Sequence, residues 1–367
     1  MKKSFNKKIS IIFLYKKGRK ERLNYLNDIP SEFFYGYREF KEEGLSVNFL
    51  EELDLNITFK NIYFQKFLNL SSKLFFNLPL NTILGIIFFK GYKKLKKADS
   101  IITTTNNLGI AVTLAKKIGL IRSNILFINM GIFYKNPNFL KLFFYKNIFK
   151  NIQLLTISKS EYIILNNLLK DTDIKYIPFG VDLSFWHPKL KNKVKPYILS
   201  IGNDLARDWD TLIKAWDEDF PTLKIITSLP LRSQKKNIEV IKGNWHFQSL
   251  SDLEMRDLYR DSEFVIVPLK ETFQPSGQST CLQAMACSKA VLISDIKGIW
   301  DRELLKHKEN IFFVKPGDKV ELNSAIRLLL KNKKLKGILE KNGRNLVNDH
   351  FNIINMKEHL QKYLEAL

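Results

Sequence analysis

The chain has 367 residues, which is enough for two domains. Its 59 Lys and Arg residues against 37 Asp and Glu give a net charge of +22, which favours an anionic partner: nucleic acid, an anionic membrane surface or a phosphorylated substrate. Only two cysteines occur, which argues against a disulfide-rich secreted protein and favours a reducing cytoplasm.

The N-terminal region predicts the start of an α/β domain. Residues 9–15 form an apolar run after a lysine-rich start; the run is too short for the core of a signal peptide and predicts a first strand. Four aromatic residues at helical spacing predict a helix over residues 31–43, which Gly44 ends. A second strand is predicted at 47–50, so the order strand, helix, strand favours a doubly wound α/β domain.

Two stretches of the first half mix apolar and basic residues. Residues 57–98 have the composition of a surface that lies on an anionic bilayer. The same composition fits a core helix followed by a solvated charged turn, and the sequence favours neither interpretation. The longest apolar region of residues 57–98, at 74–89, is shorter than the roughly 20 residues of a membrane-spanning helix, so none is predicted. Residues 138–149, capped by Asn136 and Pro137, predict a helix that is apolar nearly all round; its lysines disfavour full burial and favour membrane contact.

Polar residues follow two buried strands that are predicted at 100–104 and 125–128. Asn106 follows the first of these strands, and Asn129 and Gly131 follow the second. Ligands of open α/β sheets bind beyond the carboxyl ends of the strands. These three residues are therefore candidates for a ligand site in the first domain.

A second α/β domain begins with a strand at residue 197 that runs into Gly202, and a helix begins near Trp209. Glycine lets a backbone come close to a ligand, and the guanidinium fork of Arg207 suits phosphate oxygens. The alternative for Arg207 is a surface ion pair with Asp204 or Asp208.

The stretch 262–294 carries the clearest chemistry. Short apolar runs at 264–267 and 290–293 predict strands that are covered on both faces. A helix is predicted between them, from about Gly277 to Cys287.

Ser276 is the predicted N-cap of this helix, because its hydroxyl can accept from an N–H one turn on. The amides of Gly277, Gln278 and Ser279 would then lie at the positive end of the helix dipole, which is a site for phosphate. The alternative is an ordinary helix that covers a sheet, with Leu282 in the core.

This stretch resembles the donor-site signature of GT-B glycosyltransferases of the family-four (group 1) type, in which a strand and a glutamate-rich loop precede a helix ending in EAMACGxPV. The chain has Leu282-Gln-Ala-Met-Ala-Cys-Ser-Lys-Ala-Val291 in this place. The usual motif has two glutamates separated by seven residues, and those positions hold Pro275 and Gln283 here. The nearest carboxylate is Glu271. Gln283 can still bond ribose hydroxyls through its amide.

Other segments carry the same resemblance. Residues 176–188 resemble the IPNGVDxxxFxP segment that closes the first GT-B domain, and residues 310–318 match the NGLLVxPGD turn. Relatives have a Gly-Arg…Lys pattern that grips the diphosphate, where this chain has Gly202 and, further on, Arg207. Trp245 lies where relatives place the nucleotide base. In many relatives a histidine of the first domain contacts the donor sugar, but no histidine precedes His187 here.

The resemblance implies an α/β protein with two Rossmann-like, doubly wound domains that face each other across a cleft. The expected parts are an N-terminal acceptor-binding domain at 1–188, a linker at 189–195, a nucleotide-sugar-binding domain at 196–350, and a last helix at 351–367 that crosses back to the first domain.

The implied reaction is transfer of a hexosyl group from a nucleoside diphosphate sugar, with a UDP-sugar favoured, to an acceptor hydroxyl with retention. No metal or cofactor is expected, because preset donors can stabilise the charge of the departing diphosphate. Glu271 and Arg207 are the predicted catalytic residues. The predicted donor-binding residues are Gly202, Asn203, Asp204, Arg207, Trp245, Ser276, Gly277, Gln278, Ser279 and Gln283, and those on the acceptor or sugar side are Asn106, Asn129 and Gly131.

Three functions remain open, in this order. The first is glycolipid synthesis on a lipid acceptor by a cytoplasmic enzyme that is peripheral on the inner face of the membrane. The second is a soluble transferase that acts on a saccharide, peptide or small molecule. The third is a non-catalytic or nucleic-acid-binding GT-B relative, motivated by the charge and the lost acidic pair; nucleic acid is not the expected partner.

Overall fold

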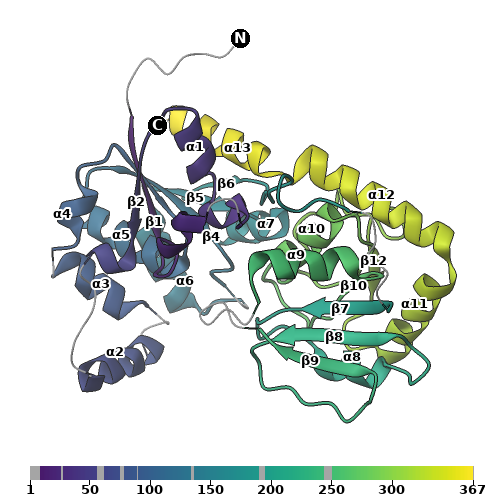
Figure 1. Cartoon of the computed structure of the whole chain (residues 1–367). Helices are drawn as coiled ribbons and strands as arrows, with labels where there is room; N and C mark the ends of the chain where they lie inside the picture. Colours follow the sequence, from purple (N-terminus) through teal and green to yellow (C-terminus); the bar gives the residue numbers. More distant parts are fainter. Residues whose placement is uncertain are drawn as a thin grey trace. The chain divides into compact units, whose positions relative to one another are not determined.

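The structure is a computed structural model, and it describes residues 9–25, 28–55, 62–74, 78–88, 90–133, 136–189, 195–243 and 250–366. The chain forms two compact α/β units (Figure 1). The first unit comprises Met1–Tyr25, Phe33–Ile177 and Met356–Leu367, and the second comprises Leu26–Glu32 and Pro178–Asn355. The division at Ile177 differs from the sequence-based boundary at 188, and residues 190–194 of the expected linker lie outside the described residues.

The first unit is built on a six-stranded sheet in which every strand pair is parallel. The strand order is β2-β1-β3-β4-β5-β6. The strands are β1 (Ser10–Tyr15), β2 (Ser46–Glu51), β3 (Ser100–Thr103), β4 (Asn124–Asn129), β5 (Gln153–Thr156) and β6 (Asp173–Tyr176). The strands β3 and β5 are buried throughout, as expected for a parallel sheet covered on both faces.

Helices connect and cover these strands. They are α1 (Tyr37–Glu42), α2 (Ile62–Leu74), α3 (Leu80–Ile87), α4 (Tyr92–Leu95), α5 (Asn106–Lys117), α6 (Phe139–Phe149) and α7 (Lys159–Leu168), together with most of α13 (Ile353–Glu365). Leu108, Ala111 and Ala115 of α5 share the core with Phe127 of β4. Among the described residues, no helix combines the length and the apolar character that crossing a membrane requires.

The second unit contains another all-parallel six-stranded sheet, with the order β12-β11-β10-β7-β8-β9. Its strands are β7 (Tyr197–Ile201), β8 (Thr222–Thr227), β9 (Ile238–Lys242), β10 (Val265–Val267), β11 (Val291–Ser294) and β12 (Phe312–Val314). Its helices are α8 (Trp209–Ala215), α9 (Asp252–Asp261), α10 (Gln278–Ala286), α11 (Lys319–Lys331) and α12 (Lys333–His350). The neighbouring strands β7, β8 and β9 can be followed in Figure 1. The predicted α/β fold class is confirmed.

Two local predictions in this part of the fold were wrong, and one helix was missed. The helix expected over 31–43 is a 3₁₀ turn at Ser31–Phe34 followed by α1, because Gly36 adopts a φ of +90° that interrupts a helix. The N-cap of α6 is Asn138, whose side chain accepts from the Lys141 amide, and not Asn136 or Pro137. The long helix α12 was not predicted.

Candidate functional site

The start of α10 differs by one residue from the prediction. The N-cap is Gly277, which has a φ of +78° and no side-chain cap, so the prediction of Ser276 as the N-cap was wrong. The Ser276 amide instead donates to the Gln274 carbonyl at 2.7 Å. A Cβ at position 277 would lie 2.6 Å from Val267 Cγ1, so both the left-handed backbone and the close packing require glycine here.

The N-terminal end of α10 presents backbone amides at the carboxyl edge of the second sheet. The helix follows β10 through the loop 268–277 and is nine residues long. The amides of Gly277 to Thr280 belong to its first turn, where no carbonyl of the same helix lies one turn earlier to accept them. This end of the helix therefore carries partial positive charge, as the sequence predicted.

Arg207 adds a full positive charge at the same place. Its side chain is buried; Nε donates to the Ile201 carbonyl at 3.1 Å, and Nη2 donates to Thr280 Oγ1 at 3.3 Å in the first turn of α10. Nη1 lies 3.2 Å from Asp204 Oδ2 in an ion pair but without hydrogen-bond geometry, so this buried nitrogen has no hydrogen-bond partner within the described residues. A Cβ on Gly277 would lie 3.2 Å from Nη1. Nη1 thus faces the N-cap of α10.

Gly202 makes room for this arginine. A Cβ at position 202 would lie only 1.8 Å from Arg207 Nε, so any side chain there would displace the guanidinium. The glycine therefore positions Arg207, a role that its place after β7 did not indicate.

The two polar residues after Gly202 hold the loop that carries Arg207. Asn203 Oδ1 accepts from Thr227 Oγ1 at 3.3 Å and from the Ser228 amide. Asp204 Oδ1 accepts from the Ala206 amide at 3.1 Å, in addition to its ion pair with Arg207. Asp208, the alternative partner considered for Arg207, instead caps α8 through the Thr211 amide.

Glu271 lies beside the Arg207 loop and is exposed. The Lys270 amide donates to the Ala206 carbonyl at 2.8 Å, and Leu269 forms a β-bridge with Arg207. Glu271 Oε1 accepts from the Lys297 amide at 2.8 Å. The structure therefore places the two predicted catalytic residues on adjoining loops of the second unit.

Gln283 lies within α10 and is buried, with both of its polar atoms bonded inside the protein. Nε2 donates to Glu32 Oε1 at 3.1 Å, and Oε1 accepts from the Tyr259 hydroxyl at 3.3 Å. Its predicted contact with ribose hydroxyls would compete with these bonds.

Glu32 is a residue of this site that sequence reasoning missed. It is fully buried; Oε1 also accepts from Trp186 Nε1 at 2.6 Å, and Oε2 accepts from the Asp182 amide at 3.0 Å. Burial raises the pKa of Glu32 to about 7, although the bonds from Gln283, Trp186 and Asp182 favour the charged form. A lone glutamate in a short turn carries no sequence signal of such a contact.

The three candidates of the first unit lie together at the carboxyl end of β4. Asn106 exchanges two bonds with the Met130 backbone, at 3.0 and 3.2 Å. The carboxylate of Glu161 accepts from Asn129 Nδ2 at 2.7 Å and from the Gly131 amide at 3.3 Å. Burial raises the pKa of Glu161 to about 7, and this second buried carboxylate was also missed. Trp245 lies outside the described residues.

One family model matches the part of the second unit that contains Arg207 and α10. Residues 196–332 match the family model described as "Glycosyl transferases group 1". A comparison with curated protein sequences gives no match.

Solved structures match the chain over nearly its whole length. Sucrose-phosphate synthase from Thermosynechococcus elongatus is 18% identical, with a TM-score of 0.69 over 97% of this chain and 98% of that one. HepE from Anabaena, solved with UDP and glucose, is 13% identical, with a TM-score of 0.65 over 98% and 100%. A trehalose-6-phosphate synthase studied for glycosyltransfer with retention is 12% identical, with a TM-score of 0.66 over 97% and 99%. Likenesses at these identities show a shared fold.

Proposed function

We propose that this chain, a glycosyltransferase with the GT-B fold and a group 1 domain, transfers a hexosyl group from a UDP-sugar to a lipid hydroxyl at a membrane surface, with retention. The GT-B fold and the glycosyltransferase class were predicted from the sequence and are confirmed. The proposal for the donor rests on one observation: Nη1 of buried Arg207 faces the N-terminal end of α10, and it has an ion pair with Asp204 but no hydrogen bond within the described residues.

Arg207 and the first-turn amides of α10 can stabilise the negative charge that develops when a diphosphate leaves a sugar. Arg207 is held by Ile201 and Thr280, and the first-turn amides are fixed by the helix, so neither has to reorganise as the bond to the sugar breaks. An arginine can bond phosphate oxygens with two nitrogens, and a helix N-terminus offers backbone amides to the same anion. The diphosphate would therefore lie with its outer phosphate at the N-terminal end of α10, on the side of Gly277 and Arg207.

Retention follows if the leaving phosphate itself takes the proton of the attacking hydroxyl on the face of the sugar that it leaves. Such a step needs donors that stabilise the phosphate more than it needs a side-chain base. The structural likeness to the trehalose-6-phosphate synthase supports this choice. In this scheme the exposed carboxylate of Glu271, held by the Lys297 amide, bonds hydroxyls of the transferred sugar.

The choice of a uridine donor has its own support. HepE, which shares the fold over nearly the whole chain, was solved with UDP and glucose. Trp245, the predicted contact of the nucleotide base, lies outside the described residues, so the choice of base is inferred from this likeness and not from contacts.

The lipid acceptor is supported by apolar side chains that the first unit exposes. On α6, Phe139, Leu140 and Phe143 are exposed, whereas Tyr145 and Phe149 in the second half of the helix are buried. Contiguous exposed apolar residues mark interaction or membrane surfaces in soluble proteins.

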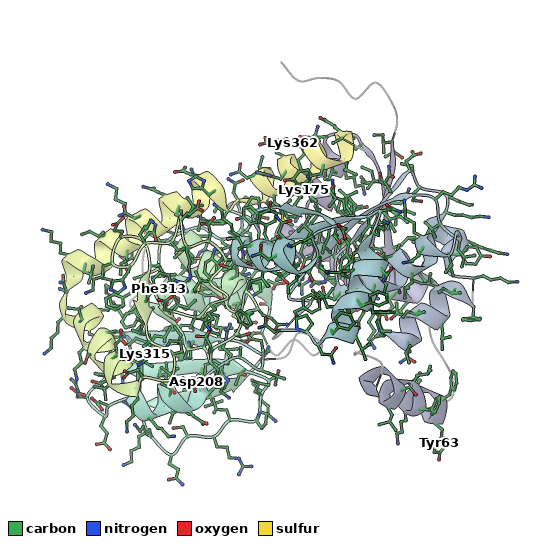
Figure 2. The ribbon with its side chains drawn as sticks, turned by 180° about the vertical axis from the view of Figure 1, so that it is seen from behind. Tyr63, Lys175, Asp208, Phe313, Lys315 and Lys362 are labelled. Carbon is green, nitrogen blue, oxygen red and sulfur yellow. The ribbon has the colours of Figure 1, made fainter. Side chains whose placement is uncertain are left out.

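A second helix of the first unit, α2, also exposes apolar side chains. Tyr63, Phe67 and Leu70 of α2 are exposed, and Figure 2 shows the Tyr63 side chain projecting from the helix. Together with the excess of lysine, these residues favour attraction to an anionic bilayer.

UDP is expected to raise the thermal midpoint of the full chain more than ADP or GDP does. Saturating the site at a hundredfold excess over Kd adds about 2.7 kcal/mol to the free energy of unfolding, which corresponds to several degrees. With a radiolabelled UDP-sugar and lipid vesicles, the label should enter the organic phase, and NMR of the product should show the anomeric configuration of the donor. Label that enters only water-soluble products would favour the soluble transferase, and an equal response to all diphosphates would contradict the uridine assignment.

A further inference from the structure

A basic cavity lies in the first unit, at the C-terminal ends of α5 and α6. Its volume is about 240 Å³, and its lining includes Lys116 and Lys117 of α5, Asn147 of α6, and Lys150 after that helix. No carboxylate belongs to the lining, so three cationic side chains share this space with no formal negative charge among the lining residues, and their charge exceeds the partial negative charge of the two helix ends. The mechanism proposed above uses none of these residues.

Two of the lysines are held in place by backbone carbonyls. Lys116 Nζ donates to the Ser123 carbonyl at 2.6 Å and to the Arg122 carbonyl at 3.5 Å, and Lys117 Nζ donates to the Asn147 carbonyl. An ammonium group has three donors, so each of these keeps capacity for an anion. Burial lowers the pKa of Lys116, which means that its charge is partly removed from water; an anion in the cavity would offset that cost.

An apolar stripe of α6 leads to this cavity. Phe139, Phe143 and Asn147 are four residues apart and share one face of the helix. The rings of Phe139 and Phe143 stack at 6.4 Å and are 78% and 61% exposed, and Asn147 Nδ2 donates to the Phe143 carbonyl. Four residues of helix rise about 6 Å, so the exposed rings begin about one helical turn from the cavity wall.

We propose that this cavity binds the phosphate of an anionic phospholipid headgroup while Phe139 and Phe143 enter the boundary of the acyl chains. Interfacial helices bury their apolar face about 5–10 Å into that boundary, which matches the spacing between rings and lysines. Charge complementarity favours an anionic lipid over a zwitterionic one. The inference deepens the membrane part of the proposed function and is independent of the donor site, since Arg207 and α10 belong to the other unit.

The test is flotation of the full chain with vesicles of phosphatidylcholine alone or with 30% phosphatidylglycerol, at low salt. The unchanged chain should float only with the anionic vesicles. The double variant Lys117→Gln with Lys150→Gln should weaken this binding about tenfold or more, because each lysine near an anionic bilayer contributes strongly to the free energy of membrane binding. The matched pair Lys333→Gln and Lys334→Gln removes the same charge from exposed positions on α12 and should bind within twofold of the unchanged chain.

Additional variants and ligands distinguish binding of a phospholipid from binding of other anions. Phe139→Ser with Phe143→Ser should lose vesicle binding but keep a thermal response to soluble glycerol phosphate. A response to inorganic phosphate without any vesicle binding, equal losses in the two lysine pairs, or preferential binding to duplex DNA would each overturn the proposal. The thermal response to UDP, measured on the same variants, should stay unchanged, so that failure here is distinguishable from failure of the transferase assignment.

Discussion

Changing Arg207 to lysine is expected to weaken UDP binding about tenfold to hundredfold while the chain remains folded. Lysine keeps the positive charge, but its single nitrogen cannot occupy the separate positions from which Nε bonds Ile201 and Nη2 bonds Thr280. Loss of a hydrogen bond to a charged group costs about 1.5–3 kcal/mol, and 1.4 kcal/mol is a factor of ten in Kd. Isothermal titration with UDP measures the effect directly.

Arg260 provides the matched control for this change. It is 4% exposed, as Arg207 is, and belongs to the same unit, but it bonds the His187 carbonyl and pairs with Asp257, and none of these residues is a predicted donor-binding residue. Arg260→Lys should therefore lower stability without changing the Kd for UDP. Equal losses of UDP affinity in the two lysine variants would contradict the role given to Arg207.

Gly202→Ala tests the same idea without touching the arginine. The added Cβ would lie 1.8 Å from Arg207 Nε, so the guanidinium has to move away from α10. UDP affinity should fall in the same direction as in Arg207→Lys. Unchanged affinity in a folded Gly202→Ala variant would mean that Arg207 does not hold the diphosphate.

Changing Glu32 to alanine is expected to destabilise the second unit by at least about 3 kcal/mol. The carboxylate accepts from Trp186, Gln283 and Asp182, and all three donors would lose their acceptor inside the protein. Each buried donor left unsatisfied costs about 1–3 kcal/mol. Urea denaturation of the full chain, followed by tryptophan fluorescence, measures the change.

Glu32 also makes stability depend on pH in a definite direction. Its pKa rises from 4.5 to about 7 on folding, so between these values the folded chain holds a proton that the unfolded chain releases. The stabilisation is fully present below pH 4.5 and is lost as the pH rises through about 7, at a cost of about 3 kcal/mol by 1.36 kcal/mol per pKa unit. Glu32→Gln should remove this slope, and Glu161→Gln should remove a separate one, since Glu161 has the same raised pKa in the other unit.

Gln283→Glu restores the residue of the usual motif and is nevertheless expected to destabilise the chain at neutral pH. It would set two carboxylates at the 3.1 Å contact with Glu32, and both cannot be ionised there. The double change Glu32→Gln with Gln283→Glu should recover part of the loss, because a donor then faces an acceptor again. Additive losses would show that the two residues are not coupled.

The departure from the usual acidic motif thus has a physical account that the sequence could not supply. Gln283 was recognised as a replaced glutamate, but its partner Glu32 is far away along the chain and joins it only through folding. The same limit applies to Glu161, which holds Asn129 and Gly131 after β4. Buried carboxylates of this kind have no local pattern that distinguishes them from solvated ones.

Elements that depend on local pattern were predictable. The apolar runs at 264–267 and 290–293 became β10 and β11, because a strand covered on both faces needs continuous apolar sequence. The N-cap of α10 was missed by one residue, because serine and glycine both suit that position and a tertiary contact with Val267 decides between them. The apolar character of α6 was evident, but not which half of the helix is exposed.

A crystal structure of the full chain with UDP tests the proposed donor site most directly. We expect the outer phosphate within hydrogen-bond distance of Arg207 Nη1 and of the first-turn amides of α10. A diphosphate bound elsewhere, with Arg207 still bonded only to Ile201, Thr280 and Asp204, would contradict this expectation.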